Sequence, residues 1–239
     1  MRRKTTAVRI GNVVLSSEEP VLVQSMLNTS TREVDACVEQ AIRIIEAGGR
    51  LVRITAPGVK EAEMLGEIHR RLRERGYTTP ISADIHFVAE AASVAARYVE
   101  KVRINPGNFA DKRATFKKLT YTDEEYAAEL EILRQKFTEF LEVCRQYGTA
   151  VRIGTNHGSL SDRIMSRYGD TPAGMVEATM EYLRVCQACD FKDVVISLKS
   201  SDCRTMVDAV RLLVEKMEAE GMCYPLHLGV TEAGEGEDG

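Results

Sequence analysis

The sequence of 239 residues predicts a parallel TIM-type β/α barrel that forms one domain over residues 1–239. Short runs rich in β-branched residues alternate with segments of helical periodicity, which implies parallel strands joined by right-handed crossovers. The length is close to the roughly 250 residues of a typical (β/α)8 barrel. An open doubly wound sheet has the same alternation, but its phosphate-binding signatures GxGxxG and GxxxxGK[ST] are absent, which favours the barrel.

Seven segments have the composition of buried strands. A further alternating stretch, residues 8–15, precedes them, and we expect it to form a short N-terminal hairpin that plugs the bottom of the barrel. No eighth strand is found, because the chain continues into the polar stretch 231–239, so we expect a barrel truncated after its seventh strand. The seven expected strands are residues 21–25, 51–55, 81–84, 101–105, 150–154, 194–197 and 226–229.

Six segments between these strands have helical periodicity, and several end in glycine. The longest begins with a capping box, in which Thr122 and Glu125 satisfy amides of the first turn. The expected helices are residues 33–47, 60–75, 87–99, 123–147, 171–189 and 202–220.

Composition excludes several classes of function. With 44% hydrophobic and 28% charged residues, and neither a membrane span nor a signal peptide, we expect a cytoplasmic protein. A net charge of −4 argues against nucleic acid as the main partner. Six cysteines scattered through helical patterns indicate reduced thiols rather than a disulfide framework. The Cys186-x-x-Cys189 pair lies at the end of a helical pattern, so we expect core packing rather than redox or metal chemistry.

The tripeptide Val-Arg-Ile recurs in three predicted strands and places Arg53, Arg103 and Arg152 in otherwise apolar runs. Because side chains alternate along a strand, these arginines face away from their apolar neighbours and can converge at the barrel mouth. A guanidinium group can donate two parallel hydrogen bonds to the oxygens of one phosphate. Three arginines around one cavity therefore suit a substrate with two phosphates.

An alternative is that each arginine pairs with a carboxylate inside the barrel, because Asp84 and Glu232 also lie at predicted strand ends. A fourth copy of the tripeptide contains Arg9, and we expect that copy to be structural.

Polar loops follow the predicted strands and share one end of the barrel. Residues 105–108 and 154–158 can expose backbone amides to an anion, Ser200 and Ser201 add hydroxyls at a helix start, and Lys199 adds a charge. Among the histidines we expect His69 on the solvated surface, His227 packed in the core, and His86 and His157 free to donate to a substrate.

These loops resemble one family closely. Five ordered motifs carry the resemblance to 4-hydroxy-3-methylbut-2-enyl diphosphate synthase, from about residue 4 to the end of the chain. The motifs are Val-Gln-Ser-Met-x-Asn-Thr at 23–29, Ala-Asp-Ile-His-Phe at 83–87, Val-Arg-Ile-Asn-Pro-Gly-Asn at 102–108, Val-Arg-Ile-Gly-Thr-Asn-His-Gly-Ser-Leu at 151–160 and Leu-His-Leu-Gly-Val-Thr-Glu-Ala-Gly at 226–234. The helical stretch between residues 108 and 150 resembles the larger three-domain forms of the family.

The resemblance implies an oxidoreductase of non-mevalonate isoprenoid biosynthesis, which reductively opens 2-C-methyl-D-erythritol 2,4-cyclodiphosphate and expels water. It implies a [4Fe-4S] cluster reduced by ferredoxin or flavodoxin. In the family the cluster is held by a C-terminal domain, so its ligands lie outside this chain and this chain alone is expected to be inactive. The two-domain forms of the family are homodimers, which makes a homodimer a further expectation.

The resemblance also assigns residues. Glu232 corresponds to the family's carboxylate near the reacting carbons, where it could relay a proton. The residues expected to bind substrate are Arg53, Arg103, Arg152, Asn156, Lys199, Asp84, His86 and Asn108.

Two other interpretations remain open. A pterin-binding methyltransferase-like barrel has the same architecture and a similarly polar mouth. Alternatively, the chain only binds substrate and does not turn it over.

Overall fold

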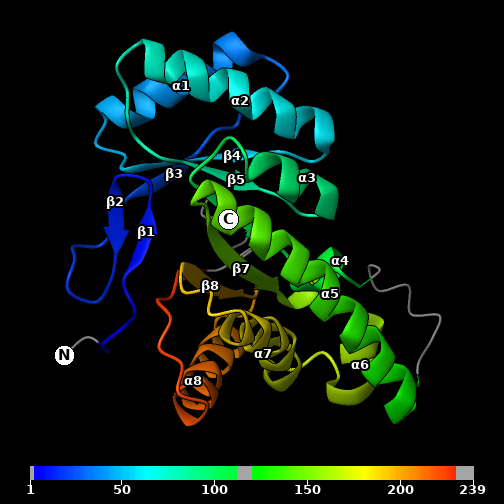
Figure 1. Cartoon of the computed structure of the whole chain (residues 1–239). Coiled ribbons are helices and arrows are strands. Elements are labelled where there is room, and N and C mark those ends of the chain that lie inside the picture. The colour runs from blue at the N-terminus through cyan, green and yellow to red at the C-terminus, as the bar shows by residue number, and fades with distance from the viewer. Residues whose placement is uncertain (1–2, 112–119, 230–239) are drawn as a thin grey trace.

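A curled sheet of six parallel strands forms the centre of the molecule (Figure 1). The computed structural model describes residues 3–111 and 120–229. The strands are hydrogen-bonded in chain order and every neighbouring pair is parallel, which confirms the predicted fold class. They are β3 (Gln24–Met26), β4 (Leu51–Thr55), β5 (Ile81–Asp84), β6 (Lys101–Ile104), β7 (Ala150–Asn156) and β8 (Val194–Lys199).

Helices connect consecutive strands, and Figure 1 shows α1 and α2 at one end of the row of strands and α7 and α8 at the other. The six predicted helices are present, although α3 is shorter than expected, and the predicted capping box of Thr122 and Glu125 begins α5. They are α1 (Val34–Glu46), α2 (Val59–Glu74), α3 (Ala89–Ala95), α5 (Asp123–Tyr147), α7 (Pro172–Ala188) and α8 (Cys203–Ala219). Three short helices were not predicted: α4 (Pro106–Phe109), the 3-10 helix η1 (His157–Ser159) and α6 (Asp162–Tyr168).

The two faces of the sheet differ in polarity because side chains alternate along each strand. The outer face, with residues such as Ile54, Val102 and Ile153, is buried in one hydrophobic core with the helices. The opposite positions on the same strands carry arginine, aspartate and lysine. The helices therefore cover the apolar face, and the polar side chains point into the barrel.

One hydrogen bond shows how strongly the sheet is curled. Lys101 Nζ on β6 donates to Gln24 Oε1 on β3 at 3.0 Å. In a flat sheet, strands three places apart would be roughly 14 Å apart, which is beyond the combined reach of these side chains. The contact therefore crosses the interior of the barrel.

A two-stranded antiparallel hairpin, β1 (Val8–Ile10) and β2 (Val13–Leu15), precedes the sheet. Val8, Ile10 and Val13 form a second hydrophobic cluster with inner-face residues near the starts of strands, among them Leu51 and Ala150. This confirms that the hairpin closes the bottom of the barrel.

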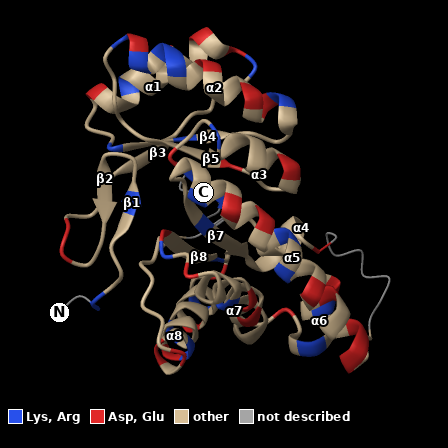
Figure 2. Cartoon of the chain, viewed as in Figure 1, with Lys and Arg blue, Asp and Glu red and all other residues tan. Residues whose placement is uncertain are grey.

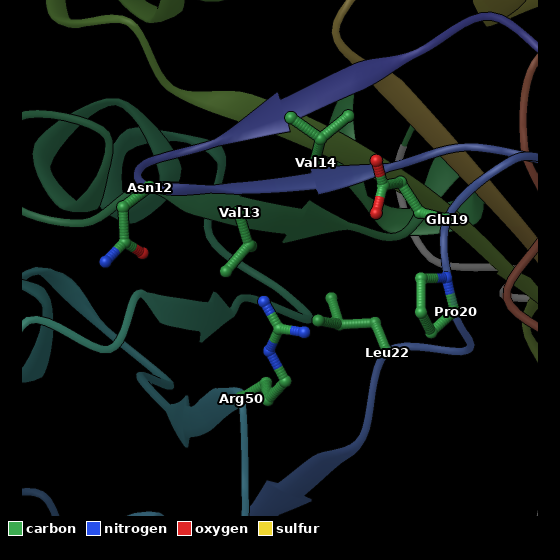
Figure 3. A pocket seen from close by; sticks show the side chains of 7 residues that line it. All are labelled: Asn12, Val13, Val14, Glu19, Pro20, Leu22 and Arg50. Atoms are coloured by element: carbon green, nitrogen blue, oxygen red, sulfur yellow. The ribbon is translucent and has the colours of Figure 1, made fainter.

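A cavity of about 220 Å³ lies beside the hairpin, between Val13, Leu22 and Arg50 (Figure 3). It is at the closed end of the barrel and is lined by none of the predicted site residues.

The first and last predicted strands differ from expectation. β3 begins at Gln24 rather than at residue 21, and Val21 and Val23 are exposed. The predicted strand 226–229 is wrong as a continuous strand. Only Leu226 forms a parallel bridge with Ile196, held by main-chain hydrogen bonds on either side of that pair. The chain nevertheless lies beside β8 in the predicted place and direction.

Candidate functional site

The three arginines of the strand tripeptides meet on the inner face of the sheet. In the strand register, Asp84 lies beside Arg103, which lies beside Arg152, so their side chains leave the same face. Arg53 joins them from β4. The convergence predicted from the spacing is confirmed.

Asp84 is the carboxylate around which these cations gather, and it is only 1% exposed. Its oxygens lie 2.8 Å from Arg53 Nη2, 3.3 Å from Arg103 Nη1, 3.7 Å from Arg152 Nη2 and 3.2 Å from His86 Nε2. The alternative of arginines paired with carboxylates is therefore correct in part. A single described carboxylate is shared among three guanidinium groups.

This sharing leaves the site positively charged. Burial alone would raise the pKa of Asp84, but the hydrogen bond from His86 and the charges of Arg103, Arg53 and Arg152 outweigh it and hold that pKa well below its usual range. Asp84 is therefore ionised at neutral pH and neutralises one of three cations. Burial and the charge of Arg103 lower the pKa of Arg152, which shows that the guanidinium groups repel one another.

Further hydrogen bonds fix the direction of two guanidinium groups. Arg103 Nη2 donates to the Gly154 carbonyl at 2.9 Å, and Arg152 Nη1 donates to Ser197 Oγ at 2.7 Å. A Cβ on Gly154 would lie 2.6 Å from Arg103 Nε, so glycine allows this close approach. The Nε atoms of Arg53, Arg103 and Arg152 are buried without a partner, which leaves donors for a ligand or water.

Lys199 and Asn156 lie side by side at the ends of β8 and β7. Burial, followed by the charges of Arg152 and Arg53, lowers the pKa of Lys199 to about 8. The predicted extra charge is thus placed at the edge of the arginine cluster.

Asn108 lies on α4, in the loop that follows β6. Its side chain is buried and its Oδ1 has no hydrogen-bond partner. The loop is held against the next one, because Asn105 Nδ2 donates to Ser159 Oγ at 2.9 Å. A Cβ on Gly107 would lie 1.6 Å from the Ser159 carbonyl oxygen, so only glycine fits here.

A buried ion cluster supports the same loop from behind. Arg163 on α6 is 1% exposed and binds Glu181 of α7 at 2.6 Å and Asp111 at 3.0 Å. The Tyr126 ring of α5 lies under its guanidinium at 4.6 Å. Arg163 therefore ties the segment after β6 to three helices.

Some predicted residues lie elsewhere than expected. His69 is only partly solvated: its Nε2 lies 2.9 Å from Glu100 Oε1, and its side chain is half-buried. His227 is half-buried rather than part of the core. His157 pairs with Asp170 at 3.0 Å. Cys186 is fully buried in the main hydrophobic core, as predicted.

Two other expectations have different outcomes. The amides at the start of α8 bind the Asp202 carboxylate rather than lying open beside Ser200 and Ser201. Glu232 lies outside the described residues.

Figure 2 shows that acidic and basic positions are mixed over α1 and α2. In the cluster around Asp84, by contrast, positive charge is in excess.

The sequence analysis did not place Lys101 or Ser197 among the substrate-binding residues, and for His227 it favoured a core position over donation to a substrate. The spacing contained a signal for Lys101, which lies two residues before Arg103 and therefore on the same face of β6. It also contained one for Ser197, which lies two residues before Lys199 on β8.

Comparisons with known proteins agree with this architecture. The family model of the GcpE TIM-barrel domain matches residues 5–239. The 4-hydroxy-3-methylbut-2-en-1-yl diphosphate synthase (flavodoxin) of Parabacteroides distasonis is 61% identical over 238 residues, which cover 100% of this chain and 39% of that protein. The chloroplastic ferredoxin form of Arabidopsis thaliana is 51% identical over 239 residues, which cover 100% of this chain and 32% of that protein. The chain thus spans 32–39% of the length of these relatives.

Among solved structures, a truncated 3-deoxy-D-arabino-heptulosonate 7-phosphate synthase from Thermotoga maritima has a TM-score of 0.51 at 14% identity, and covers 89% of this chain and 66% of that one. At this identity the likeness supports the fold alone. Within residues 3–111 and 120–229, no helix is long and apolar enough to cross a membrane.

Proposed function

Because the chain belongs to the GcpE TIM-barrel domain family, we propose that its inner face binds the diphosphate of 2-C-methyl-D-erythritol 2,4-cyclodiphosphate. The bound substrate would be reductively opened and dehydrated to 4-hydroxy-3-methylbut-2-enyl diphosphate. Residues 1–239 would act as one substrate-binding barrel domain of that oxidoreductase.

The observation that carries the proposal is the charge of the cluster around Asp84. Two buried guanidinium groups, of Arg103 and Arg152, and the partly buried one of Arg53 share one described carboxylate, and their Nε donors are unpartnered. Uncompensated buried charge is costly, and an anion with several oxygens would both neutralise it and accept these hydrogen bonds. Inside a poorly hydrated barrel such contacts are stronger than in water.

We assign a role to each proposed residue. The substrate's phosphates would accept hydrogen bonds from Arg53, Arg103, Arg152 and Lys199, and from the amides of Asn156 and Asn108. Asp84 and His86 would hold the guanidinium groups in place, since Asp84 contacts Arg53 and Arg103 and His86 contacts Arg103. Glu232, outside the described residues, would give a proton to the departing oxygen, and Glu232→Gln in the full-length enzyme should then abolish turnover at every pH.

The electrons would come from a [4Fe-4S] cluster reduced by flavodoxin or ferredoxin, the donors in the names of the relatives. Within the described residues, no three His, Cys, Asp or Glu side chains are grouped so that they could hold a metal ion. These residues do not fit the cluster, and no electron-transfer step is derived from them. The barrel's own contribution is to bind and orient the substrate.

Titration calorimetry with the cyclodiphosphate tests the binding. Arg152→Met should weaken binding by roughly 2–5 kcal/mol, because it removes a desolvated charge from the site. Arg9→Met is the matched control: it changes the same tripeptide, but Arg9 is exposed on the hairpin. Equal affinities for the two variants would remove Arg152 from the site. Binding of a pteridine without binding of the cyclodiphosphate would favour the pterin-binding barrel instead.

A further inference from the structure

Lys101 is a buried lysine beneath the arginine cluster, and the proposed function gives it no role. It is the first residue of β6 and is 2% exposed. Its Nζ donates to the neutral amide oxygen of Gln24 at 3.0 Å, across the interior of the barrel. None of the ion pairs found between described residues includes Lys101.

The surroundings of Lys101 are strongly positive. The charges that act on it most strongly are those of Arg152 and Arg53, and the described carboxylate of Asp84 acts in the opposite sense. The described charged or titratable groups that face this interior, taken over all the strands packed around it, are Arg53, Asp84, His86, Arg103, Arg152, Lys199 and His227. An added ammonium would thus enter a site in which cations already outnumber carboxylates.

The buried, cationic surroundings of Lys101 therefore favour its neutral amine over its ammonium form. Burial, followed by the charges of Arg152 and Arg53, lowers the pKa of Lys101 well below its usual value. A neutral amine retains two N–H groups, so the hydrogen bond to Gln24 survives deprotonation. Either form therefore fits the observed geometry.

We propose that Lys101 takes up a proton when a diphosphate binds to the arginine cluster, so that the charge of the site adjusts to that of its ligand. The lone pair of the neutral amine binds one proton from solvent, and no other bond forms or breaks. The inference rests on the proposed function, because it requires an anion at the cluster. It adds Lys101 as a positioning residue that sets the charge beneath that anion.

The sign of the pH effect follows from linkage. Because the complex holds one more proton than the free protein, affinity rises as the pH falls between the free-state and bound-state pKa values of Lys101. Uptake of one full proton would change the affinity about tenfold per pH unit within that window.

Lys199 and His227 could also take up a proton when a ligand binds. Measurement at pH 7 leaves little room for uptake by Lys199. The pKa of Lys199 is lowered to about 8, so at pH 7 it is already about nine-tenths protonated in the free protein. The pKa of His227 is lowered to about 3 by burial and then by the charge of Arg152. His227 is neutral at pH 7 and needs its own control, His227→Gln.

The test is titration calorimetry of the intact protein with inorganic pyrophosphate at pH 7, in two buffers of different ionisation enthalpy. The difference between the two heats gives the number of protons bound per ligand. Pyrophosphate's own titration is common to all variants, so the comparison between variants isolates the protein group.

Lys101→Met should bind fewer protons than the unmodified protein, by most of one proton, whereas His227→Gln should keep the full uptake. Lys101→Arg keeps a permanent charge, so it should lose the uptake while retaining more affinity than Lys101→Met. Unchanged uptake in both Lys101 variants would overturn the inference, as would uptake lost only in His227→Gln. If pyrophosphate fails to bind even the unmodified protein, the proposed function fails and this inference with it.

Discussion

Replacement of Asp84 by asparagine removes the one described carboxylate that contacts the three arginines. Asparagine keeps the size of the side chain and one oxygen acceptor, so packing is preserved, while the negative charge is lost and the second acceptor oxygen becomes an NH2 donor. Asp84 is 1% exposed and two of its partners, Arg103 and Arg152, are each 2% exposed, so solvent screens little of the change. Among residues 3–111 and 120–229, the variant therefore leaves the three mutually repelling guanidinium groups without a carboxylate in contact.

The cost follows from what is known of buried ion pairs. Removal of one partner of such a pair costs about 3–5 kcal/mol, because the remaining charge stays buried and unpaired. For a chain of this size, each kcal/mol lowers the melting temperature by roughly 2–4 °C. We expect Asp84→Asn to melt about 6–20 °C below the unmodified protein.

Thermal denaturation with and without pyrophosphate measures this effect. The anion supplies negative charge that the variant lacks, so pyrophosphate should raise the melting temperature more in Asp84→Asn than in the unmodified protein. Asp170→Asn is the control, because Asp170 is exposed and its ion pair with the half-buried His157 should cost within about 0.5 kcal/mol to lose. If the Asp84 variant melts as high as this control, the carboxylate does not hold the cluster together.

The pH dependence adds a second criterion. The folded-state pKa of Asp84 lies below its unfolded value, so its contribution is complete above an unfolded pKa of about 3.9 and is lost as the pH falls further. Because Asp84 also raises the pKa of Lys199, which lies at about 8, the stability difference between the unmodified protein and Asp84→Asn should not shrink as the pH falls from 8 to 5. A difference that shrinks within that range would contradict the assigned ionisation of Asp84.

Three other perturbations test separate parts of the structure. Gly154→Ala places a methyl group 2.6 Å from Arg103 Nε, so urea denaturation should show a loss of about 1–3 kcal/mol. Arg163→Met leaves the buried Glu181 carboxylate uncompensated and should cost about 3–5 kcal/mol in the same assay. A variant as stable as the unmodified protein would contradict either expectation. Because burial and nearby cations lower the pKa of His227 to about 3, stability should fall by up to about 1.4 kcal/mol per pH unit below pH 6.5, and His227→Gln should remove that slope.

Local patterns in the sequence were sufficient to predict the elements and the direction of the arginines. Arg53, Arg103 and Arg152 face the barrel interior because their neighbours on each strand are apolar and pack under the helices. The same tripeptide at Arg9 has the opposite outcome. In the hairpin, Val8 and Ile10 pack onto the bottom of the barrel, which leaves Arg9 exposed. The tripeptide sets which side chains share a face, and the element around it decides where that face points.

Contacts across the barrel could not be predicted in this way. The partners Gln24 and Lys101 are 77 residues apart, and they meet only because the sheet curls. Likewise, the sharing of Asp84 among three strands depends on register and curvature rather than on any local pattern. The sequence predicted which charged residues face the barrel interior. It could not predict how many arginines contact each carboxylate, because that number depends on the curvature of the sheet.

The ratio of one described carboxylate to three arginines links the stability of the barrel to its proposed function. With no carboxylate at all, the guanidinium groups would repel one another and lose their positions before a ligand arrived. With a carboxylate for each arginine, the site would be neutral and an anion would have to displace bound partners. One carboxylate among three arginines holds the geometry and leaves an excess of positive charge for the ligand. Part of the free energy of anion binding would therefore come from relief of repulsion that the folded, ligand-free barrel already contains.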